Sequence, residues 1–267
     1  MISVPEVVIE RVCAVRGSGE GLADLARRAV EGLGAPSGVR GVVAATFSSP
    51  DRFPSLAVRA AGWLGLPADT PAFDVQMACS AYPYALYLAG RLAADTGGKV
   101  VVVDGDVQLP LVDANDHATG SIFSDACTAS LVGAGDGVSR FAFLSRASAD
   151  LACPASGPIS MDGMKVFTFV ATEVSRFLRE FGRESDVFVP HQANQYMVRQ
   201  LARTLGLEDR LLVIPEEAKN PGSCSVPMAL AANPRPGARA LVAGFGAGYS
   251  AAAGIVSLSP GFEGKVL

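Results

Sequence analysis

Histidine is scarce in this sequence, and long apolar runs are missing. Of the 267 residues only His117 and His191 are histidines, which argues against a histidine-rich zinc site and leaves two candidates for histidine chemistry. We therefore expect no metal. No stretch approaches the roughly 18 consecutive apolar residues that a membrane-spanning helix requires, so we expect no membrane partner.

Basic runs are also missing. The chain has 22 Lys and Arg against 26 Asp and Glu, a formal charge of −4 at pH 7. Nucleic-acid binding depends on clustered cations that neutralise phosphates. We therefore expect no nucleic-acid partner.

Cysteine usage predicts a reducing compartment. The five cysteines show no CxxC spacing, and their odd number does not suit a disulfide framework. Residues 1–16 carry four charged side chains, so they lack the apolar core of a signal peptide. Both observations predict reduced thiols and a cytoplasmic location.

The composition and pattern favour an α/β protein. Hydrophobic residues make up 49% of the chain, with 29 glycines. Apolar periodicity predicts helices over residues 21–34, 56–64 and 85–92, and β-branched runs predict strands over 42–47 and 99–103 and a weaker one over 129–132. Residues 133–157 are expected to form a loop. This alternation predicts a layered α/β fold.

The second half of the chain repeats the first at an offset of about 140 residues. Three segments recur in the same order: 42–66 with 186–207, 79–86 with 223–230, and 99–103 with 239–243. We therefore expect two halves, 1–150 and 151–267, packed as one unit with a site between them.

Two residues that follow predicted strands are candidates for chemistry. Cys79 precedes a helix, whose amino end stabilises a thiolate and lowers its pKa, so it is a candidate nucleophile; the alternative is an inert buried thiol. His191 follows the strand at 187–190 and is a candidate base or hydrogen-bond donor, or else a histidine that caps a loop. His117 lies in a polar run and is expected to be a solvated loop residue.

The repeat gives weight to Asn220. An Asn before a Pro is ordinarily a turn or helix-cap signal. In the repeat, however, Asn220 begins the helical element equivalent to that of Cys79, so the two should approach one another with His191 beside them. The glycines at 244–248 indicate close approach of backbone, but they do not form a dinucleotide fingerprint.

Taken together, five segments resemble the β-ketoacyl-ACP synthase III group of the thiolase superfamily. They are residues 73–86, 121–132, 161–167, 189–194 (Val-Pro-His-Gln-Ala-Asn) and 220–230. The resemblance covers about residues 21–258. It implies a duplicated αβαβα thiolase-like fold with two pseudo-symmetric halves, a homodimer, and a catalytic triad of Cys79, His191 and Asn220.

The resemblance also implies a reaction. Cys79 would take an acyl group from acyl-CoA or an acyl carrier protein, with the backbone N–H groups of Cys79 and Ala247 as the oxyanion hole. His191 and Asn220 would then stabilise the enolate formed when a malonyl unit loses CO₂. Phe245, Gln192 and Asn194 are candidate pocket residues, and no cofactor is implied.

The chain departs from this family at several positions. Relative to the family it is shortened at the amino end, where a Trp and an Arg hold the coenzyme A adenine. Met164 stands where the family has an Asn, and Ser124, Ala126 and Thr128 replace glycines around Asp125. The loop over 133–160 is also short. We therefore expect a more open mouth and a donor that is a carrier protein or a bulky secondary-metabolite thioester.

Two other functions remain open at this stage. One is an acyltransferase that uses Cys79 and His191 to form an ester or amide without a new carbon–carbon bond. The other is a non-catalytic subunit that forms a heteromer with a related full-length synthase. Retention of all three triad residues argues against the second, because a structural subunit does not require them.

Overall fold

The computed structural model describes residues 1–116, 119–182 and 184–267. His117, expected in a solvated loop, lies outside the described residues. The first half contains β1 (Ile2–Arg16), α1 (Leu22–Gly32), β2 (Val39–Ala45), α2 (Leu56–Trp63), β3 (Ala72–Val75), α3 (Ala81–Thr96), β4 (Lys99–Asp106) and β5 (Ala126–Ser145). The second half contains β6 (Leu151–Ala152), β7 (Ser160–Met161), α4 (Gly163–Phe169), α5 (Ser175–Arg179), β8 (Val187–Pro190), α6 (Gln195–Leu205), α7 (Ser225–Ala232), β9 (Arg239–Gly246) and β10 (Ser250–Val266).

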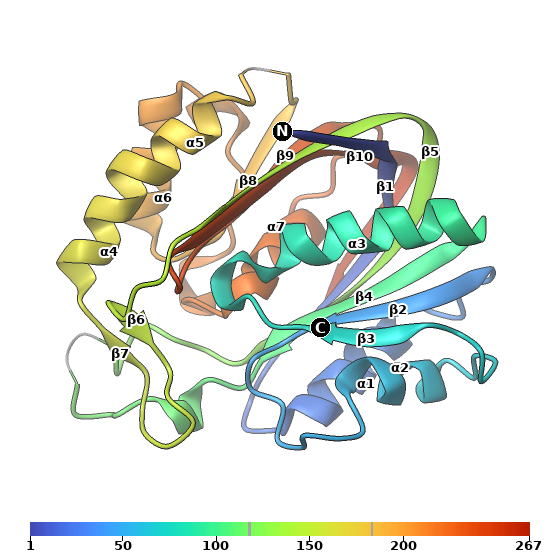
Figure 1. Cartoon of the computed structure of the whole chain (residues 1–267), viewed down its shortest axis with the longest axis horizontal. Helices are drawn as coiled ribbons and strands as arrows, with labels where there is room; N and C mark the ends of the chain where they lie inside the picture. Colours follow the sequence, from blue (N-terminus) through green and yellow to red (C-terminus); the bar gives the residue numbers. More distant parts are fainter. Residues whose placement is uncertain (117–118, 183) are drawn as a thin grey trace.

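Three long strands, β1, β5 and β10, join the two halves of the sheet. The strand order is β3-β2-β4-β5-β1-β10-β9-β8, and β5 also pairs with β10. β1 pairs antiparallel with β5 and parallel with β10. Because these strands run through both halves, the sheet bends strongly between them (Figure 1).

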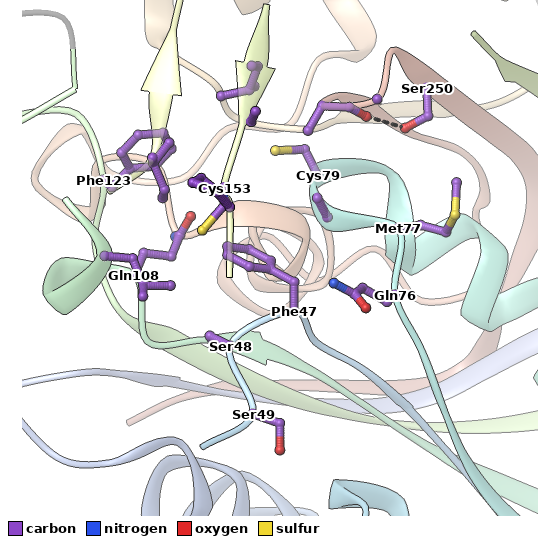
Figure 2. A pocket seen from close by; sticks show the side chains of 18 of the residues that line it. Phe47, Ser48, Ser49, Gln76, Met77, Cys79, Gln108, Phe123, Cys153 and Ser250 are labelled. Carbon is purple, nitrogen blue, oxygen red and sulfur yellow. Dashed lines mark hydrogen bonds between the residues drawn. The ribbon is translucent and has the colours of Figure 1, made fainter. Parts of the chain in front are cut away.

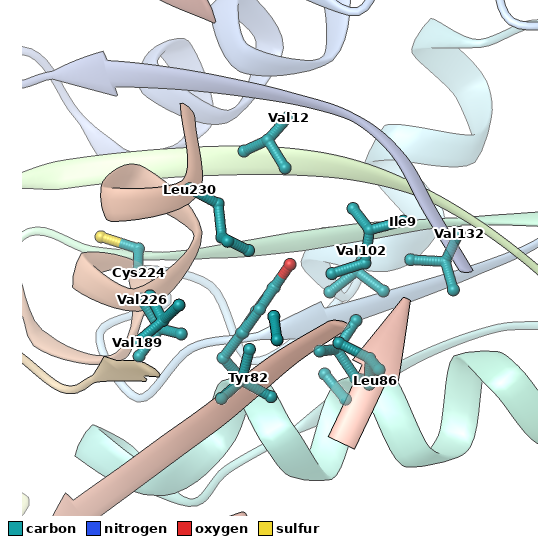
Figure 3. Packing of buried hydrophobic residues seen from close by; sticks show 14 of the residues in the cluster. Ile9, Val12, Tyr82, Leu86, Val102, Val132, Val189, Cys224, Val226 and Leu230 are labelled. Carbon is teal, nitrogen blue, oxygen red and sulfur yellow. The ribbon is translucent and has the colours of Figure 1, made fainter. Parts of the chain in front are cut away.

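Three hydrophobic clusters divide the molecule into layers. The first packs α1 and α2 against β2, β4 and β5, and the second packs α4, α5 and α6 against β8, β9 and β10. The third holds α3 and α7 between the two halves of the sheet. Figure 3 shows Tyr82 and Leu86 of α3 in this central cluster, facing Val102 and Leu230. The layers therefore alternate helix, sheet, helix, sheet, helix, which confirms the expected layered α/β fold.

The expectation of a loop over residues 133–157 is wrong for residues 133–145, which form a strand, whereas 146–150 and 153–157 are loop. β5 continues to Ser145, and its Gly135 lies opposite Glu6 of β1, where an added side chain would collide with the Glu6 carboxylate. The register of the β1–β5 pair shifts between Pro5 and Glu6. This glycine therefore makes room within a strand, although it looks like a loop residue in the sequence.

The repeat has counterparts in the structure. β2, α3 and β4 of the first half correspond in order to β8, α7 and β9 of the second. A boundary near residue 150 falls between β5 and β6, and we retain the division into 1–150 and 151–267 as a proposal. In the described parts of the chain, no helix is both long and apolar enough to span a bilayer.

Candidate active site

Cys79 lies in a short strained turn between β3 and α3. The turn Ala78–Ser80 follows β3 directly, and Ala78 has φ +43°. A non-glycine residue in this left-handed region costs roughly 1–2 kcal/mol. The turn is held because the N–H of Ser80 donates to the Met77 carbonyl at 3.1 Å. The strain is stored where the thiol is presented, as is common at functional sites.

The Cys79 thiol is held by backbone N–H groups and by burial. The backbone N–H groups of Ala247 and of Cys79 itself act to lower its pKa. Burial has the larger effect, and Asp106 adds to it, so the pKa of Cys79 is raised to about 11. The expected lowering of this pKa is therefore wrong: the helix end is present, but the loss of solvent outweighs it. The thiol is protonated at neutral pH.

The expected close approach of the glycine segment is confirmed. Gly246, the last residue of β9, has φ +151°, and a Cβ there would lie 3.0 Å from the Cys79 Cβ and 3.2 Å from its Sγ. A Cβ on Gly244 would lie 2.7 Å from the Ser80 Cα. Gly244 and Gly246 are both part of the strand β9. Glycine at both positions lets β9 pack against the turn that carries the thiol.

His191 is buried immediately after β8. It is 2% exposed, and its backbone N–H donates to the Ala243 carbonyl at 2.7 Å. The ring Nδ1 lies 3.0 Å from the Gly222 carbonyl oxygen and 3.0 Å from the Ser225 Oγ. Burial lowers the pKa of His191 to about 4, with the Gly222 carbonyl opposing the shift. The imidazole is therefore neutral at pH 7.

Asn220 is fixed by its backbone and has a free amide. Its N–H donates to the Ile122 carbonyl at 3.1 Å, and its own carbonyl accepts from the Ser124 N–H at 3.1 Å. Its Oδ1 accepts from the Gly222 N–H at 3.0 Å. Within the described chain the Nδ2 has no partner, so it is available as a donor. Asn220 does not begin a helix as expected, because the turn Gly222–Cys224 precedes α7.

Contacts between the two halves place the turn of Cys79 against the segment that holds His191 and Asn220. The N–H of Tyr82, in the first turn of α3, donates to the Ser223 Oγ at 2.7 Å. The turn that carries Cys79 also packs against Gly222–Cys224. Gly222 is in turn hydrogen-bonded to His191 through its carbonyl and to Asn220 through its N–H.

The candidate pocket residues have other roles in the structure. Phe245 packs edge-on against the ring of His191, with centroids 5.7 Å apart. The Gln192 amide donates to the Pro190 carbonyl at 2.6 Å, and the Asn194 Oδ1 caps α6 by accepting from the Met197 N–H at 2.8 Å. None of the three lines the cavity described below. A substrate contact through them stays a prediction.

A cavity of about 1020 Å³ opens in front of Cys79. Figure 2 shows Cys79 facing it from one side and Phe123, Phe47 and Cys153 from the other. Its walls come from the loop after β2, the turn before α3, the loop after β4, the β6–β7 hairpin and the start of β10. Apolar side chains dominate these walls, including Phe47, Met77, Leu111, Phe123, Leu151 and Ile159. A cavity of this size and lining suits a largely apolar acyl group attached to the thiol.

Sequence reasoning missed two buried polar residues near this site. Gln108 follows β4, is 1% exposed and lines the cavity. Asp104, inside β4, is fully buried, and burial raises the pKa of its carboxyl well above the usual range, with Asp106 as a further cause. Both were detectable in the sequence, because a polar residue within or just after a valine-rich strand is unusual.

The substituted positions around Asp125 are structural. Its Oδ1 accepts from the backbone N–H groups of Gln108 at 2.6 Å and Leu109 at 2.9 Å. The Ser124 hydroxyl donates to the Ala218 carbonyl at 2.7 Å, and the Thr128 hydroxyl to the Asp104 carbonyl at 3.0 Å. The described residues contain no group of three or more His, Cys, Asp or Glu that could hold a metal.

Family models match both halves of the chain. The model described as 3-oxoacyl-[acyl-carrier-protein] synthase III matches residues 73–149, which include Cys79. The model described as the C-terminal part of the same enzyme matches residues 182–258, which include His191 and Asn220.

Curated relatives extend this similarity over most of the chain. A β-ketoacyl-ACP synthase III of Neisseria meningitidis serogroup C is 30% identical over 256 residues, covering 85% of this chain and 80% of that protein. The enzyme of the same name from Rhizorhabdus wittichii is 31% identical over 243 residues, covering 81% and 76%. The chain therefore belongs to the β-ketoacyl-ACP synthase III family.

Solved structures confirm the thiolase-like fold. A 3-oxoacyl-ACP synthase from Burkholderia xenovorans LB400 superposes with a TM-score of 0.90 at 22% identity, covering 100% of this chain and 98% of that one. The priming β-ketosynthase from the R1128 polyketide biosynthetic pathway gives 0.81 at 25% identity, covering 96% and 98%.

Proposed function

We propose that this protein transfers an acyl group to Cys79 and condenses it with a malonyl thioester. The observation that carries the proposal is the position of Cys79, which faces a largely apolar cavity with two backbone N–H groups at its thiol. Its turn also packs against the segment that holds His191 and Asn220. The product would be a β-ketoacyl thioester for fatty-acid-like or polyketide biosynthesis.

In the loading step, the thiol must lose its proton as it attacks the donor thioester. His191 is the base in our proposal: the Gly222 carbonyl can only accept, so this contact places a proton on Nδ1 and a lone pair on Nε2. The N–H groups of Cys79 and Ala247 stabilise the tetrahedral oxyanion. The bond from sulfur to the acyl carbon forms, the donor's carbon–sulfur bond breaks, and the proton passes to the departing thiol.

In the condensation step, His191 and Asn220 act as hydrogen-bond donors. The free Nδ2 of Asn220 and an Nε2–H of His191 hold the malonyl thioester oxygen while CO₂ leaves. The resulting enolate carbon attacks the acyl group on Cys79. A carbon–carbon bond forms, the acyl–sulfur bond breaks, and the released thiolate takes up one proton from water, the proton that decarboxylative condensation consumes.

The donor carrier is part of the proposal. Met164, which stands where the family has an Asn, lies at the start of α4, is 76% exposed and does not line the cavity. This favours an acyl carrier protein or a bulky secondary-metabolite thioester over tight recognition of coenzyme A. No cofactor enters either step.

The open sheet edge supports a homodimer. Among the strands of the described residues, β3 is terminal and pairs only with β2, and its Phe73 is 38% exposed. An unpaired edge of this kind is a template for pairing with a second chain. Because Gln76 and Met77 follow β3 and line the cavity, such a dimer would complete the site. All five thiols are free, which supports a cytoplasmic location.

Product analysis tests the function. The protein is incubated with an acyl donor and ¹³C-labelled malonyl carrier protein, and the carrier protein is examined by mass spectrometry. A β-ketoacyl product that carries label supports condensation. Transfer of the acyl group to an alcohol or amine, without loss of CO₂, would favour the ester- or amide-forming acyltransferase, and inactivity until a full-length synthase is added would favour the partner subunit.

A further inference from the structure

Gln108 is locked in one orientation beside the cavity. Its Nε2 donates to the Ser124 carbonyl at 2.8 Å and to the Asn220 carbonyl at 3.2 Å. Both partners are backbone carbonyls, which can only accept, so the NH₂ group must face them and the amide cannot be reversed. The side chain thus ties the loop after β4 to the Asn220 segment.

This orientation leaves the Gln108 Oε1 facing the cavity. Figure 2 shows the amide oxygen directed toward the space between Phe123 and Cys153. Gln108 is 1% exposed and lines the cavity, and no hydrogen-bond donor among the described residues reaches its Oε1. When the cavity is empty of substrate, a water molecule can bond to this oxygen because the cavity is open and large.

An apolar acyl chain would remove that water without replacing it. Phe47, Leu111, Phe123 and Ile159 line the same cavity and have no side-chain donor, and Cys153 has only the weak S–H donor of a thiol. A buried acceptor left without a partner is unfavourable, because no hydrogen bond compensates for its lost contact with water. An acyl group with its own hydroxyl or N–H would satisfy the Oε1 and avoid this cost. Sites built to bond such a group discriminate strongly against substrates that lack it.

We propose that the acyl group carried by Cys79 bears a hydrogen-bond donor, a hydroxyl or an N–H, which is recognised by the Oε1 of Gln108. The inference rests on the proposed function, because it concerns the substrate class of the same cavity. It makes Gln108 a specificity residue on the acyl side, while its Nε2 holds the segment of Asn220 on the other side.

The test compares loading rates of Cys79 for matched acyl thioesters. One set of acyl chains carries a hydroxyl at successive carbons, and a second set carries an amide. Each of these chains is paired with a plain chain of equal length. Loading is followed by intact-protein mass spectrometry. The wild type should load its best hydroxyl- or N–H-bearing chain about tenfold faster than the plain partner, as expected for one buried hydrogen bond.

Variants separate recognition from the structural contact with Asn220. In Gln108→Leu, and in Gln108→Met as a second replacement, the hydroxyl- or N–H-bearing chain should load no faster than its plain partner. A general loss of rate through the Asn220 segment affects both members of a pair and cancels in the ratio. Gln76→Leu is the matched control, because Gln76 also lines the cavity but is exposed; its preference should stay as in the wild type.

The outcomes distinguish this inference from the proposed function. Equal or faster loading of the plain chains by the wild type would overturn the inference while the proposed function stands, as would an unchanged preference in both Gln108 variants. Loading of Cys79 by no thioester at all would overturn the proposed function, and the inference with it.

Discussion

The Nδ1 of His191 lies 3.0 Å from the hydroxyl of Ser225. The same hydroxyl accepts from the Gln192 N–H at 3.1 Å, which leaves its own proton free to donate to Nδ1. The Gly222 carbonyl on the other side can only accept. The two neighbours therefore support opposite tautomers of one neutral ring: Gly222 favours an Nε2 lone pair, and Ser225 favours an Nε2 proton.

Ser225→Ala should separate the two steps of the reaction. Loading needs the Nε2 lone pair and should be largely retained, whereas malonyl decarboxylation needs the Nε2 proton and should fall about tenfold, the value of one lost hydrogen bond. Rapid-quench measurement of acyl-enzyme and of released ¹⁴CO₂ follows each step. Ser225→Cys keeps the side-chain volume with a weak donor and should resemble the Ala variant. Equal loss of both steps would argue against the tautomer account.

Asn220→Ala should affect decarboxylation more than loading. The substitution removes the unpartnered Nδ2, which the account assigns to the malonyl thioester oxygen. Loss of one such donor typically lowers the rate by about 100–1000-fold. The ratio of decarboxylation to loading, measured with the same protein preparation, isolates this effect from any change in folding. A parallel fall in both rates would assign Asn220 a structural role through its contact with Gly222.

The buried His191 should make the protein less stable in acid. Its pKa is lowered from 6.5 to about 4 in the folded state, so the unfolded chain binds the extra proton between these values. The stability that the neutral His191 ring contributes is complete above pH 6.5 and is lost as the pH falls through 4. The free energy of unfolding changes by about 3 kcal/mol over this range. Chemical denaturation of wild type and His191→Asn at pH 7, 5.5 and 4 measures it.

The difference in unfolding free energy between the wild type and His191→Asn should shrink by about 3 kcal/mol from pH 7 to pH 4. The pKa of Asp106 is raised to about 6, mainly by burial, so its contribution to stability grows as the pH falls. Asp106 is present in both proteins, and its effect cancels in the difference. A difference that is independent of pH would contradict the lowered pKa of His191.

Gly246→Ala should impair loading. The added methyl group would lie 3.2 Å from the Cys79 Sγ, on a backbone with φ +151°. Because alanine is strained at this φ, the substitution should cost about 1 kcal/mol or more in stability. The displaced thiol should load slowly even where thermal unfolding shows a folded protein. Gly62→Ala is the matched control, because a Cβ at Gly62 meets nothing within 4 Å. Normal loading by Gly246→Ala would show that the close approach is not needed.

Local patterns predicted the strands and helices that hold the site, and longer-range effects account for the errors. The apolar runs near β2 and β4 and the repeat could be read from residue types alone. The continuation of β5 could not, because Gly135 and Gly137 are explained by their contact with Glu6, which lies on a strand far away in sequence. The direction of the Cys79 pKa shift also required the fold: the sequence gives the helix end but not the degree of burial.

The central claim is that Cys79 carries the acyl group and that a malonyl thioester discharges it. The most direct measurement is intact-protein mass spectrometry of wild type and Cys79→Ala after incubation with acyl-CoA and acyl-carrier-protein donors, followed by malonyl carrier protein. We predict an acyl adduct on the wild type alone, which malonyl carrier protein removes with release of CO₂. An adduct that persists in Cys79→Ala, or one that malonyl carrier protein leaves in place, would contradict it.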